Sequence, residues 1–526
     1  MSDDLPDQFD LVVIGTGKKK SFNTPSTLHD DSLLLLLGFT ESCIAAAASR
    51  IGKTVLHIDP NEYYGDVWSS FSLDAFNNLL EQSNTMVRNG SFVWHEASDN
   101  ADWTREKLLE KSRRFSLDLS PRVAYSAGEL VKLLIKSNIC RYAEFRALDH
   151  VCMWYNNELV SVPCSRSDVF NTKTLSIVEK RLLMKFLTTC NDYGEDKCNE
   201  DSLEFRGRTF LEYLKAQRVT DKIATCVMQA IAMCTHDTSF EEGMQRTQRF
   251  LGSLGRYGNT PFLFPMYGCG ELPQCFCRLC AVYGGIYCLK RGVDDISVEA
   301  NFSDLLVSSA GKTLRAKQVV CAPGQVPAAH LHSELRAHIS RGLLIATSPL
   351  GGEDLNKGGG GVNLLRLLTS DGQREAFLIQ LSHYSGTCPE GLYLFHLTTQ
   401  AISEDPAADL APFTELLFGV QAPQLIYSAY FTIAAQAATN TAPNTPIYCT
   451  APPSYELDYD AAIANAQEIF GKLYADAEFL PRAPDPEEIV VDGEDPSALN
   501  EHSLPEDLRA QLHDLEHAAQ DMDIAE

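Results

Sequence analysis

An apolar run that ends in two glycines constrains the fold of this chain more than any other feature. Residues 9–17, Phe-Asp-Leu-Val-Val-Ile-Gly-Thr-Gly, predict a buried strand that leads into a glycine turn. Residues 39–50 predict a helix with Thr40 as its N-cap, and residues 54–59 predict a second strand. Together these elements make a βαβ unit of the type that binds dinucleotides.

The spacing within this unit is interrupted by a foreign segment. An acidic residue normally closes the second strand roughly 20 residues after the glycines, but Gly15 and Asp59 are 44 residues apart (59 − 15). Removing residues 18–38, a length of 21 (38 − 17), leaves a spacing of 23. The segment begins with three lysines, contains a run of five leucines and has neither a helical nor a strand period. We interpret it as a retained intron, because its Gly-Lys start and leucine run match a translated splice donor and pyrimidine tract; a genuine loop insertion is the alternative.

Composition indicates a soluble protein of two or three domains. The 526 residues are 44% hydrophobic and 22% charged, and the acidic start lacks a signal-peptide pattern. We therefore expect a cytosolic protein whose 16 cysteines are reduced thiols. A net charge of −26 argues against nucleic acid as a partner. Half of that charge lies in residues 484–526, where fourteen Asp and Glu stand against one Arg; we expect a mainly disordered acidic tail there, or alternatively a docking arm.

The predicted elements fall into two classes along the chain. Amphipathic helical patterns cover residues 121–136, 175–190, 211–214 and 223–233, whereas strand-like runs occur at 285–289, 318–321, 342–346, 392–397 and 447–450. We therefore predict an α/β fold. Its large domain, residues 1–164 and 251–483, has the βαβ dinucleotide-type fold with an added β-sheet, and residues 165–250 form a smaller inserted helical domain.

The glycine loop is degenerate for a cofactor. Rejoined across the foreign segment, it runs Gly15-Thr16-Gly17-Phe39-Thr40-Glu41, so that Glu41 replaces the third glycine of the G-x-G-x-x-G pattern. A carboxylate in the first helical turn satisfies the free N–H groups itself and repels a phosphate. We expect no flavin or NAD, and we regard Gly15, Gly17, Glu41 and Asp59 as a loop that has lost its ligand.

A cluster of cysteines around residues 269–288 raises the possibility of a zinc site. It contains C-x-C-x-x-C, but neither a second C-x-x-C nor a histidine pair at ligand spacing. The cysteines accompany an apolar stripe of Leu272, Phe276, Leu279 and Tyr283, and free cysteine behaves as a small buried hydrophobe. We expect no metal, and we find no arrangement of catalytic residues with a recognisable frame.

The same helix carries a polar stripe on a second face. Glu271, Gln274 and Arg278 follow one another at i, i+3 and i+7. A solvated face is the usual explanation, but glycines and prolines restrict the backbone on both sides of this stripe. Such restriction favours a preorganised platform for a protein partner.

Three segments resemble the family of Rab escort proteins and Rab GDP-dissociation inhibitors. They are residues 55–65 (Val-Leu-His-Ile-Asp-Pro-Asn-Glu-Tyr-Tyr-Gly), residues 137–145 (Ser-Asn-Ile-Cys-Arg-Tyr-Ala-Glu-Phe) and the glycine- and proline-rich residues 256–278. The resemblance implies a flavoprotein-like large domain that has lost its flavin, plus a small helical domain. It also implies that Tyr64, Glu271, Gln274 and Arg278 form the platform that grips the GDP form of a Rab GTPase.

A fourth segment resembles the escort branch of that family. Residues 162–181 are similar to the part of escort proteins that docks on the α subunit of Rab geranylgeranyltransferase, with Phe170 and Arg181 at the contact positions. From the residues alone, Leu175, Val178, Leu182 and Phe186 form a core stripe, and Arg181 points away from it. An exposed Phe next to an Arg is a plausible pair of interface hot spots.

The escort branch implies a non-catalytic accessory subunit of the transferase. Such a protein binds unprenylated and prenylated Rab in the GDP form and presents the Rab C-terminal cysteines. It then shields the isoprenoid groups and makes transient contact with membranes to deliver Rab. The alternative within the family is a GDP-dissociation inhibitor, and the alternative of another class is an FAD-dependent oxidoreductase.

We predict that deleting residues 18–38 raises soluble yield and thermal stability without reducing partner binding. A connection of about two to six residues is normal between a strand and the following helix, and an exposed run of five leucines promotes aggregation. Expression yield and melting temperature of the full chain and the deletion variant test this. A deletion variant that misfolds would show that the segment is a real structural element.

Overall fold

The computed structural model describes most of the chain, with gaps. The described residues are 5–15, 38–59, 66–82, 86–95, 102–194, 204–298, 304–322, 336–356, 360–369, 372–419, 423–435 and 446–482. Residues up to Pro481 belong to one compact unit, and a second unit covers Arg482–Glu526. The predicted acidic tail, most of the foreign segment, and both Gly17 and Tyr64 therefore lie outside the described residues.

The predicted βαβ unit is present and forms the centre of the first sheet. Strand β1 (Gln8–Ile14) pairs in parallel with β2 (Val55–Ile58) on one side and with β14 (Lys312–Cys321) on the other. The sheet order is β11-β2-β1-β14-β13-β12, and β20 also pairs with β14. The remaining strands are β11 (Ile286–Cys288), β12 (Asp295–Val298), β13 (Leu305–Ser309) and β20 (Ile447–Cys449).

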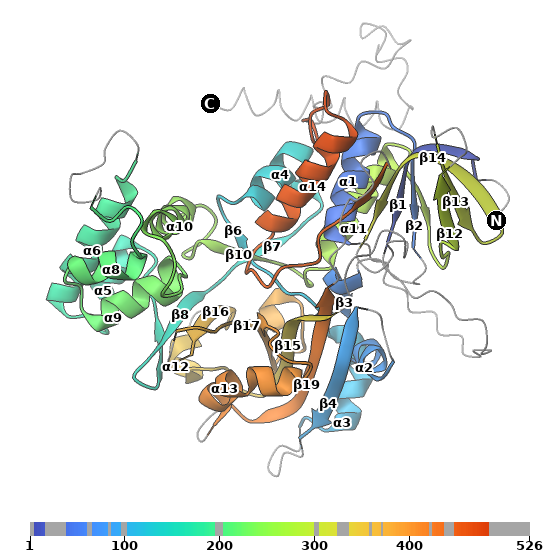
Figure 1. Ribbon diagram of the computed structural model, residues 1–526. Coiled ribbons are helices and arrows are strands. Elements are labelled where there is room, and N and C mark those ends of the chain that lie inside the picture. Colours follow the sequence, from blue (N-terminus) through green and yellow to red (C-terminus); the bar gives the residue numbers. More distant parts are fainter. Residues whose placement is uncertain are drawn as a thin grey trace, which may run out of the picture. The chain divides into compact units, whose positions relative to one another are not determined.

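Helix α1 (Phe39–Arg50) is the most deeply buried helix of this region. Nearly all of its residues are buried, because it packs against α11 (Glu271–Val282) and α14 (Asp460–Leu473) as well as against the sheet (Figure 1). The prediction of Thr40 as N-cap was wrong. Gly38 holds that position, and no side chain caps the helix in the usual way. Thr40 lies inside the first turn and is buried, so its hydroxyl is not available at the helix end.

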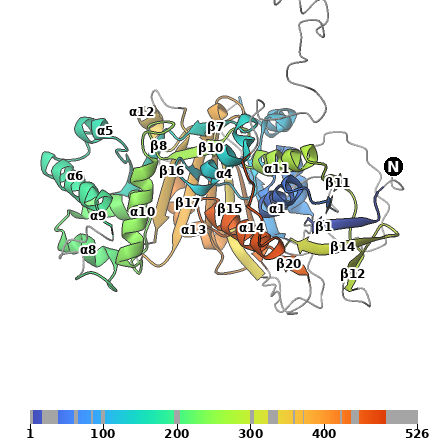
Figure 2. The ribbon, with the colours of Figure 1, turned by 90° about the horizontal axis from the view of Figure 1, so that it is seen from above.

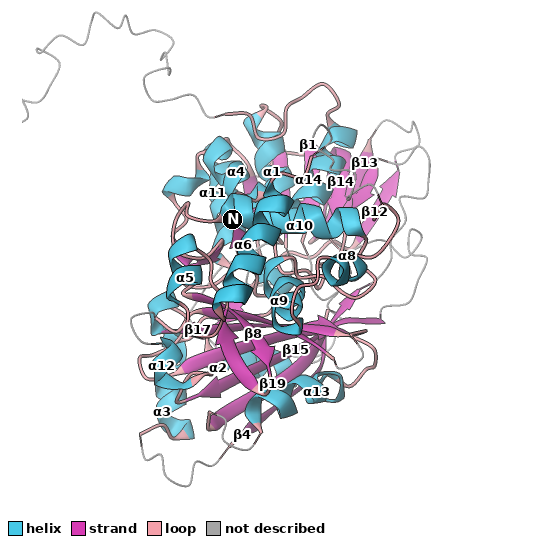
Figure 3. Ribbon diagram, turned by 90° about the vertical axis from the view of Figure 1, so that its left-hand side faces the viewer, coloured by secondary structure: helices cyan, strands magenta, loops and turns pink. Residues whose placement is uncertain are grey.

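The second sheet has eight strands in the order β4-β19-β15-β18-β17-β16-β8-β9. Helix α13 (Pro406–Phe418) packs on β15, β18 and β19, as Figure 3 shows. The strands are β4 (Val87–Trp94), β8 (His150–Tyr155), β9 (Glu158–Ser161), β15 (Arg336–Ala346), β16 (Asn363–Leu368), β17 (Glu375–Ser382), β18 (Tyr393–Gln400) and β19 (Leu425–Ala435). Each strand-like run predicted from the sequence therefore falls in an observed strand of one sheet or the other.

The helical pattern predicted from residue 121 begins later than expected. Helix α4 runs only from Glu129 to Ser137, because Ala124–Tyr125 form the short strand β6. Strand β6 pairs with β10 (Phe262–Pro265), whose other neighbour is β7 (Phe145–Ala147). Two further short strands, β3 (Ser70–Phe71) and β5 (Leu117–Asp118), pair with each other.

Between residues 166 and 253 the described chain is helical. The helices gather together in Figures 1 and 2: α5 (Arg166–Asn171), α6 (Ile177–Asn191), α8 (Phe210–Ala216), α9 (Asp221–Cys226), a π-helix (Val227–Ile231) and α10 (Phe240–Ser253). We call residues 166–253 the helical block. Its existence agrees with the predicted fold class, whereas its boundaries as a separate domain stay a prediction.

The core stripe predicted for α6 was right in part, since Leu175 and Phe186 are buried and Leu182 is half-buried, but it was wrong at Val178. Leu183, Phe186 and Cys190 are the buried residues of this helix, and the Cys190 thiol contacts Met244 of α10. Val178 is 65% exposed instead of buried. Val178 lies in the first turn of this helix, which begins at Ile177 with a capping box.

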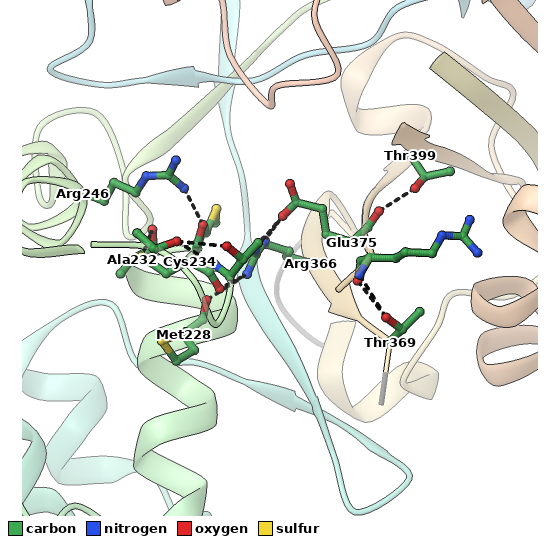
Figure 4. Close-up of polar contacts among 12 residues, drawn as sticks. Met228, Ala232, Cys234, Arg246, Arg366, Thr369, Glu375 and Thr399 are labelled. Carbon is green, nitrogen blue, oxygen red and sulfur yellow. Dashed lines mark hydrogen bonds and ion pairs between the residues drawn. The ribbon is translucent and has the colours of Figure 1, made fainter. Parts of the chain in front are cut away.

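An arginine of the second sheet holds the helical block by its backbone (Figure 4). Arg366 of β16 is almost fully buried, and its Nη1 donates hydrogen bonds of 2.9 Å to the carbonyls of both Met228 and Cys234. Its Nε donates to Glu375 Oε2 at 2.7 Å, so the buried charge is paired. From the block side, Arg246 of α10 donates to the Met233 carbonyl at 2.8 Å. Two arginines therefore fix the turn that follows the π-helix.

We predict that Arg366→Ala lowers the free energy of unfolding by about 3–5 kcal/mol, because it strands the Glu375 carboxylate and two buried carbonyls. Urea unfolding of wild type and variant measures the difference. Lys132→Ala, which breaks an exposed surface ion pair on α4, is the control and should cost about 1 kcal/mol or less. Equal losses in the two variants would contradict the role given to Arg366.

Candidate functional site

The glycine loop after β1 does not fit a dinucleotide phosphate. Glu41 is almost fully buried in the first turn of α1, and its carboxylate accepts a hydrogen bond from the Thr450 hydroxyl. The same carboxylate fills the space beside Gly38, where even a β-carbon would collide with it. Burial raises the pKa of Glu41 above its ordinary value. A phosphate placed at this helix end would meet a carboxyl group instead of free N–H donors, which agrees with the expected loss of the cofactor.

The two other described residues of this loop also leave little room. Gly15 follows β1, and the Asp59 carboxylate packs directly against its α-carbon. Asp59 closes β2 as predicted and is buried. The described residues of the loop therefore pack tightly against one another where β1 and β2 end.

The cysteines of α11 are structural in the described protein. Cys269, Cys275 and Cys280 are buried, and all of the cysteines that the structure describes are free thiols. Burial raises the pKa of Cys275 to about 11, so this thiol is neutral and a poor nucleophile. The described residues contain no group of three or more side chains suited to a metal ion.

Helix α11 presents the predicted polar stripe at the surface. Its apolar positions Leu272, Phe276 and Leu279 are buried, while Glu271 and Gln274 are half-buried. Arg278 is exposed, and its guanidinium lies 4.7 Å from the ring centroid of Tyr142. Tyr283, expected in the apolar stripe, is instead 39% exposed, because it lies beyond the helix as its C-cap residue.

Glu271 is half-buried and lies near the negative charge of Asp118. Burial, and then the charge of Asp118, raises the pKa of Glu271 above its ordinary value. A cleft of about 220 Å³ opens beside it, and Gln274, Arg113, Arg114 and Tyr267 also line this cleft. We call Glu271, Gln274 and Arg278 the platform. The structure thus places these three predicted residues on one helix face, and two of them, Glu271 and Gln274, line the cleft.

Asp118 fixes the loop that leads into the platform helix. Its Oδ1 accepts hydrogen bonds from the Cys269 N–H at 2.9 Å and from the Ser70 hydroxyl. The same hydroxyl accepts from the Gly270 N–H at 2.9 Å. Gly270 lies so close to Ser70 that a β-carbon would collide with its backbone nitrogen. The residue before α11 must therefore be small, and Asp118 sets where the platform begins.

The second predicted site lies on the helical block. Phe170 of α5 is 71% exposed, and Ile177 and Val178 of α6 are also largely exposed, as is Arg181. The Lys180 ammonium donates to the Phe170 carbonyl at 2.7 Å, which ties the two helices together. We call Phe170, Ile177, Val178 and Arg181 the α5–α6 patch. An apolar surface of this kind with an adjacent arginine is typical of a protein interface.

Sequence reasoning missed the residues that support these sites. Asp118, Ser70 and Tyr142 were not selected, although Asp118 and Tyr142 belong to segments with strong local motifs. Their roles depend on contacts over long sequence separations, such as that between Asp118 and Cys269. A carboxylate between two leucines, as in Leu117-Asp118-Leu119, is the signal that could have found Asp118.

Comparisons with known proteins agree with this geometry. A family model described as GDP dissociation inhibitor matches residues 27–477. The chain belongs to the GDP dissociation inhibitor family. It is 71% identical to a Drosophila melanogaster protein named Rab proteins geranylgeranyltransferase component A, over all of both chains. It is 29% identical to the human protein named component A 1, over 96% of this chain and 97% of that protein.

Solved structures support the fold class of this family member. A Rab GDI from Plasmodium falciparum superimposes with a TM-score of 0.68 at 18% identity, covering 90% of this chain and all of that one. An oxidoreductase from Methanosarcina mazei has a TM-score of 0.52 at 12% identity, covering 87% and 99%. The likeness to an oxidoreductase concerns the fold alone, and the buried Glu41 does not fit a cofactor phosphate. In the described parts of the chain, no helix is both long and apolar enough to span a membrane.

We predict that Asp118 makes the stability of this family member depend on pH. Burial raises the pKa of Asp118 to about 6 from an ordinary 3.8. Between these values the folded protein keeps a proton that the unfolded chain loses, so stability falls as pH rises towards 6. The difference in unfolding free energy between wild type and Asp118→Asn should therefore decrease by about 3 kcal/mol across this window and then level off. Urea unfolding from pH 4 to pH 8 measures it, and a constant difference would contradict the assignment.

Proposed function

We propose that this chain is the non-catalytic accessory component, component A, of a Rab geranylgeranyltransferase. The observation that carries the proposal is 71% identity over the full length of a Drosophila protein with that name. In this role it binds a GDP-bound Rab GTPase and presents the Rab C-terminal cysteines to the transferase. It then shields the attached isoprenoids and delivers Rab to membranes. The free state of every described cysteine supports a reducing compartment, and we place the protein in the cytosol.

The platform is the proposed site for Rab. Arg278 is exposed and oriented by stacking on Tyr142, which leaves guanidinium N–H groups available to a partner. Glu271 and Gln274 add hydrogen-bonding groups along the same helix face, beside the cleft. We assign Tyr64 to the same platform on the basis of the family motif alone, since it lies outside the described residues.

The α5–α6 patch is the proposed site for the α subunit of the transferase. It lies on different elements from the platform, so one protein could hold Rab and the transferase at the same time. The exposure of Phe170, at 71%, supports this assignment because a free-standing aromatic ring is unfavourable in water. A GDP-dissociation inhibitor, the alternative within the family, has no need of this surface.

A cavity in the helical block has apolar walls that suit an isoprenoid chain, and Arg166, Asn191 and Asp192 also line it. It measures about 390 Å³, and Met184, Leu187, Leu251 and Leu254 are the half-buried apolar residues at its walls. Exposing an isoprenoid to water costs about 25 cal/mol per Å² of apolar surface, so a carrier must offer such walls. We propose that this cavity, between α5, α6 and α10, receives the lipid.

A cleft with polar and apolar walls lies along the edge of the second sheet. It measures about 540 Å³ and is lined by the edge strand β9, by the end of α5 and by Asn259 and Thr260, which lie within the motif that begins at Arg256. An edge strand offers free N–H and C=O groups to an extended peptide of almost any sequence. We propose that the Rab C-terminal segment passes through this cleft.

We predict that Arg278→Ala weakens binding of GDP-bound Rab by about 2 kcal/mol or more, because a planar multi-donor side chain is lost from the platform. Titration with GDP-bound Rab measures the affinity. Arg208→Ala, which removes a similarly exposed arginine from the helical block, is the matched control and should leave Rab affinity unchanged. Loss of affinity in both variants, or in neither, would remove Arg278 from the proposed site.

We predict that Phe170→Ala combined with Arg181→Ala abolishes recruitment of the transferase while Rab affinity is kept. The two side chains lie on the α5–α6 patch and not on the platform. Rab prenylation at normal protein concentrations and binding to isolated transferase measure the effect. Ile402→Ala combined with Lys472→Ala removes an exposed apolar side chain and a cation elsewhere and serves as the control. Prenylation that continues unchanged in the first double variant would remove Phe170 and Arg181 from the transferase site, and the escort assignment would lose its main discriminating support.

A further inference from the structure

Two exposed tyrosines flank one turn next to the platform. Tyr267 follows β10, and Tyr384 lies in the turn His383–Ser385 at the end of β17. Each of the two is 52% exposed. Both rings present a large apolar surface to solvent, in addition to their hydroxyl groups. Such side chains are enriched at protein interfaces because one end is apolar and the other tolerates water.

The backbone at Tyr267 is held in a conformation that tyrosine does not favour. Its φ angle is +66°, in the left-handed region. The Tyr267 N–H donates to the Ser385 carbonyl at 2.9 Å, and its own carbonyl accepts from the Ser116 hydroxyl. These two hydrogen bonds therefore hold Tyr267 in a strained backbone conformation, with its side chain exposed at the surface. A glycine would satisfy this backbone without strain, so the ring itself calls for a functional explanation.

Two glycines make space for the rings. A β-carbon on Gly386, whose φ is +72°, would collide with the Tyr267 ring. A β-carbon on Gly360 would collide with the Tyr384 ring and with the Arg146 guanidinium. Arg146 lies over the Tyr384 ring at 5.2 Å and is anchored by Asp149 at 3.0 Å. Both rings are therefore positioned in advance, which lowers the entropy lost when a partner binds.

We infer that Tyr267 and Tyr384 form an aromatic extension of the platform that contacts the same GDP-bound GTPase. This inference rests on the proposed function. The cleft of about 220 Å³ joins the two surfaces, because Glu271 and Gln274 line one part of it and Tyr267 and Gly386 line another. A partner seated on the platform covers this cleft and meets Tyr267 at once. The α5–α6 patch shares no residue with this surface, which argues against the transferase as the partner.

The test uses the full chain and GDP-bound Rab, with affinity from titration and stability from thermal unfolding. Tyr267→Gly is the decisive variant, because glycine tolerates the positive φ. We expect its melting temperature to be unchanged or higher while affinity falls about tenfold or more. A purely structural role predicts the opposite pattern, a lower melting temperature with unchanged affinity, and would overturn the inference. Tyr384→Ala should also weaken binding about tenfold, and Tyr283→Ala, an exposed tyrosine at the far end of α11, should not.

Two further outcomes separate this inference from the proposed function. Normal Rab affinity in both Tyr267→Gly and Tyr384→Ala, together with a weakened Arg278→Ala, would reject the aromatic extension alone. Absence of Rab binding by the wild-type chain would reject the proposed function. Normal Rab affinity but reduced transferase binding in the tyrosine variants would assign the surface to the transferase and overturn the inference.

Discussion

Two buried ionisable side chains, Arg341 and Asp118, connect the second sheet to the platform. Arg341 of β15 is fully buried, and its Nε donates to the Leu119 carbonyl at 2.9 Å, directly after Asp118. The positive charge of Arg341 stabilises the ionised form of Asp118, although burial is the larger effect on that carboxyl. Asp118 in turn bonds the Cys269 N–H ahead of α11. These hydrogen bonds hold the strand, the loop and the helix in one relative placement.

The buried carboxyl at the start of α1 and the platform belong to one packed arrangement of helices. Glu41 closes the phosphate position at α1, and α1 packs along α11, which carries the platform. The position of α11, and with it the platform, depends on this packing against α1.

The sequence was most informative where local patterns decide the structure. The βαβ unit, the strand runs and the helical block follow from hydrophobic periodicity, and the polar stripe of α11 follows from its spacing. The prediction of Thr40 as N-cap was wrong because the helix already begins at Phe39, directly after Gly38. The stripe of α6 was wrong at Val178, an apolar residue that is exposed at an interface-like patch. The strain at Tyr267 was invisible, since nothing in a lone tyrosine reveals a positive φ.

The π-helix Val227–Ile231 has contacts on two sides. Ile231 lines the apolar cavity of the helical block, while the Met228 carbonyl of the same helix is held by Arg366 of the second sheet. A ligand that displaces Ile231 therefore strains the hydrogen bond between the Met228 carbonyl and Arg366. The sheet that holds Arg366 also holds Arg341, which bonds the residue after Asp118, and Asp118 positions the platform helix. Linkage requires any such coupling free energy to be equal in both directions. If bound lipid changes the affinity for the proposed GTPase partner by some factor, the bound GTPase must change the affinity for the lipid by the same factor.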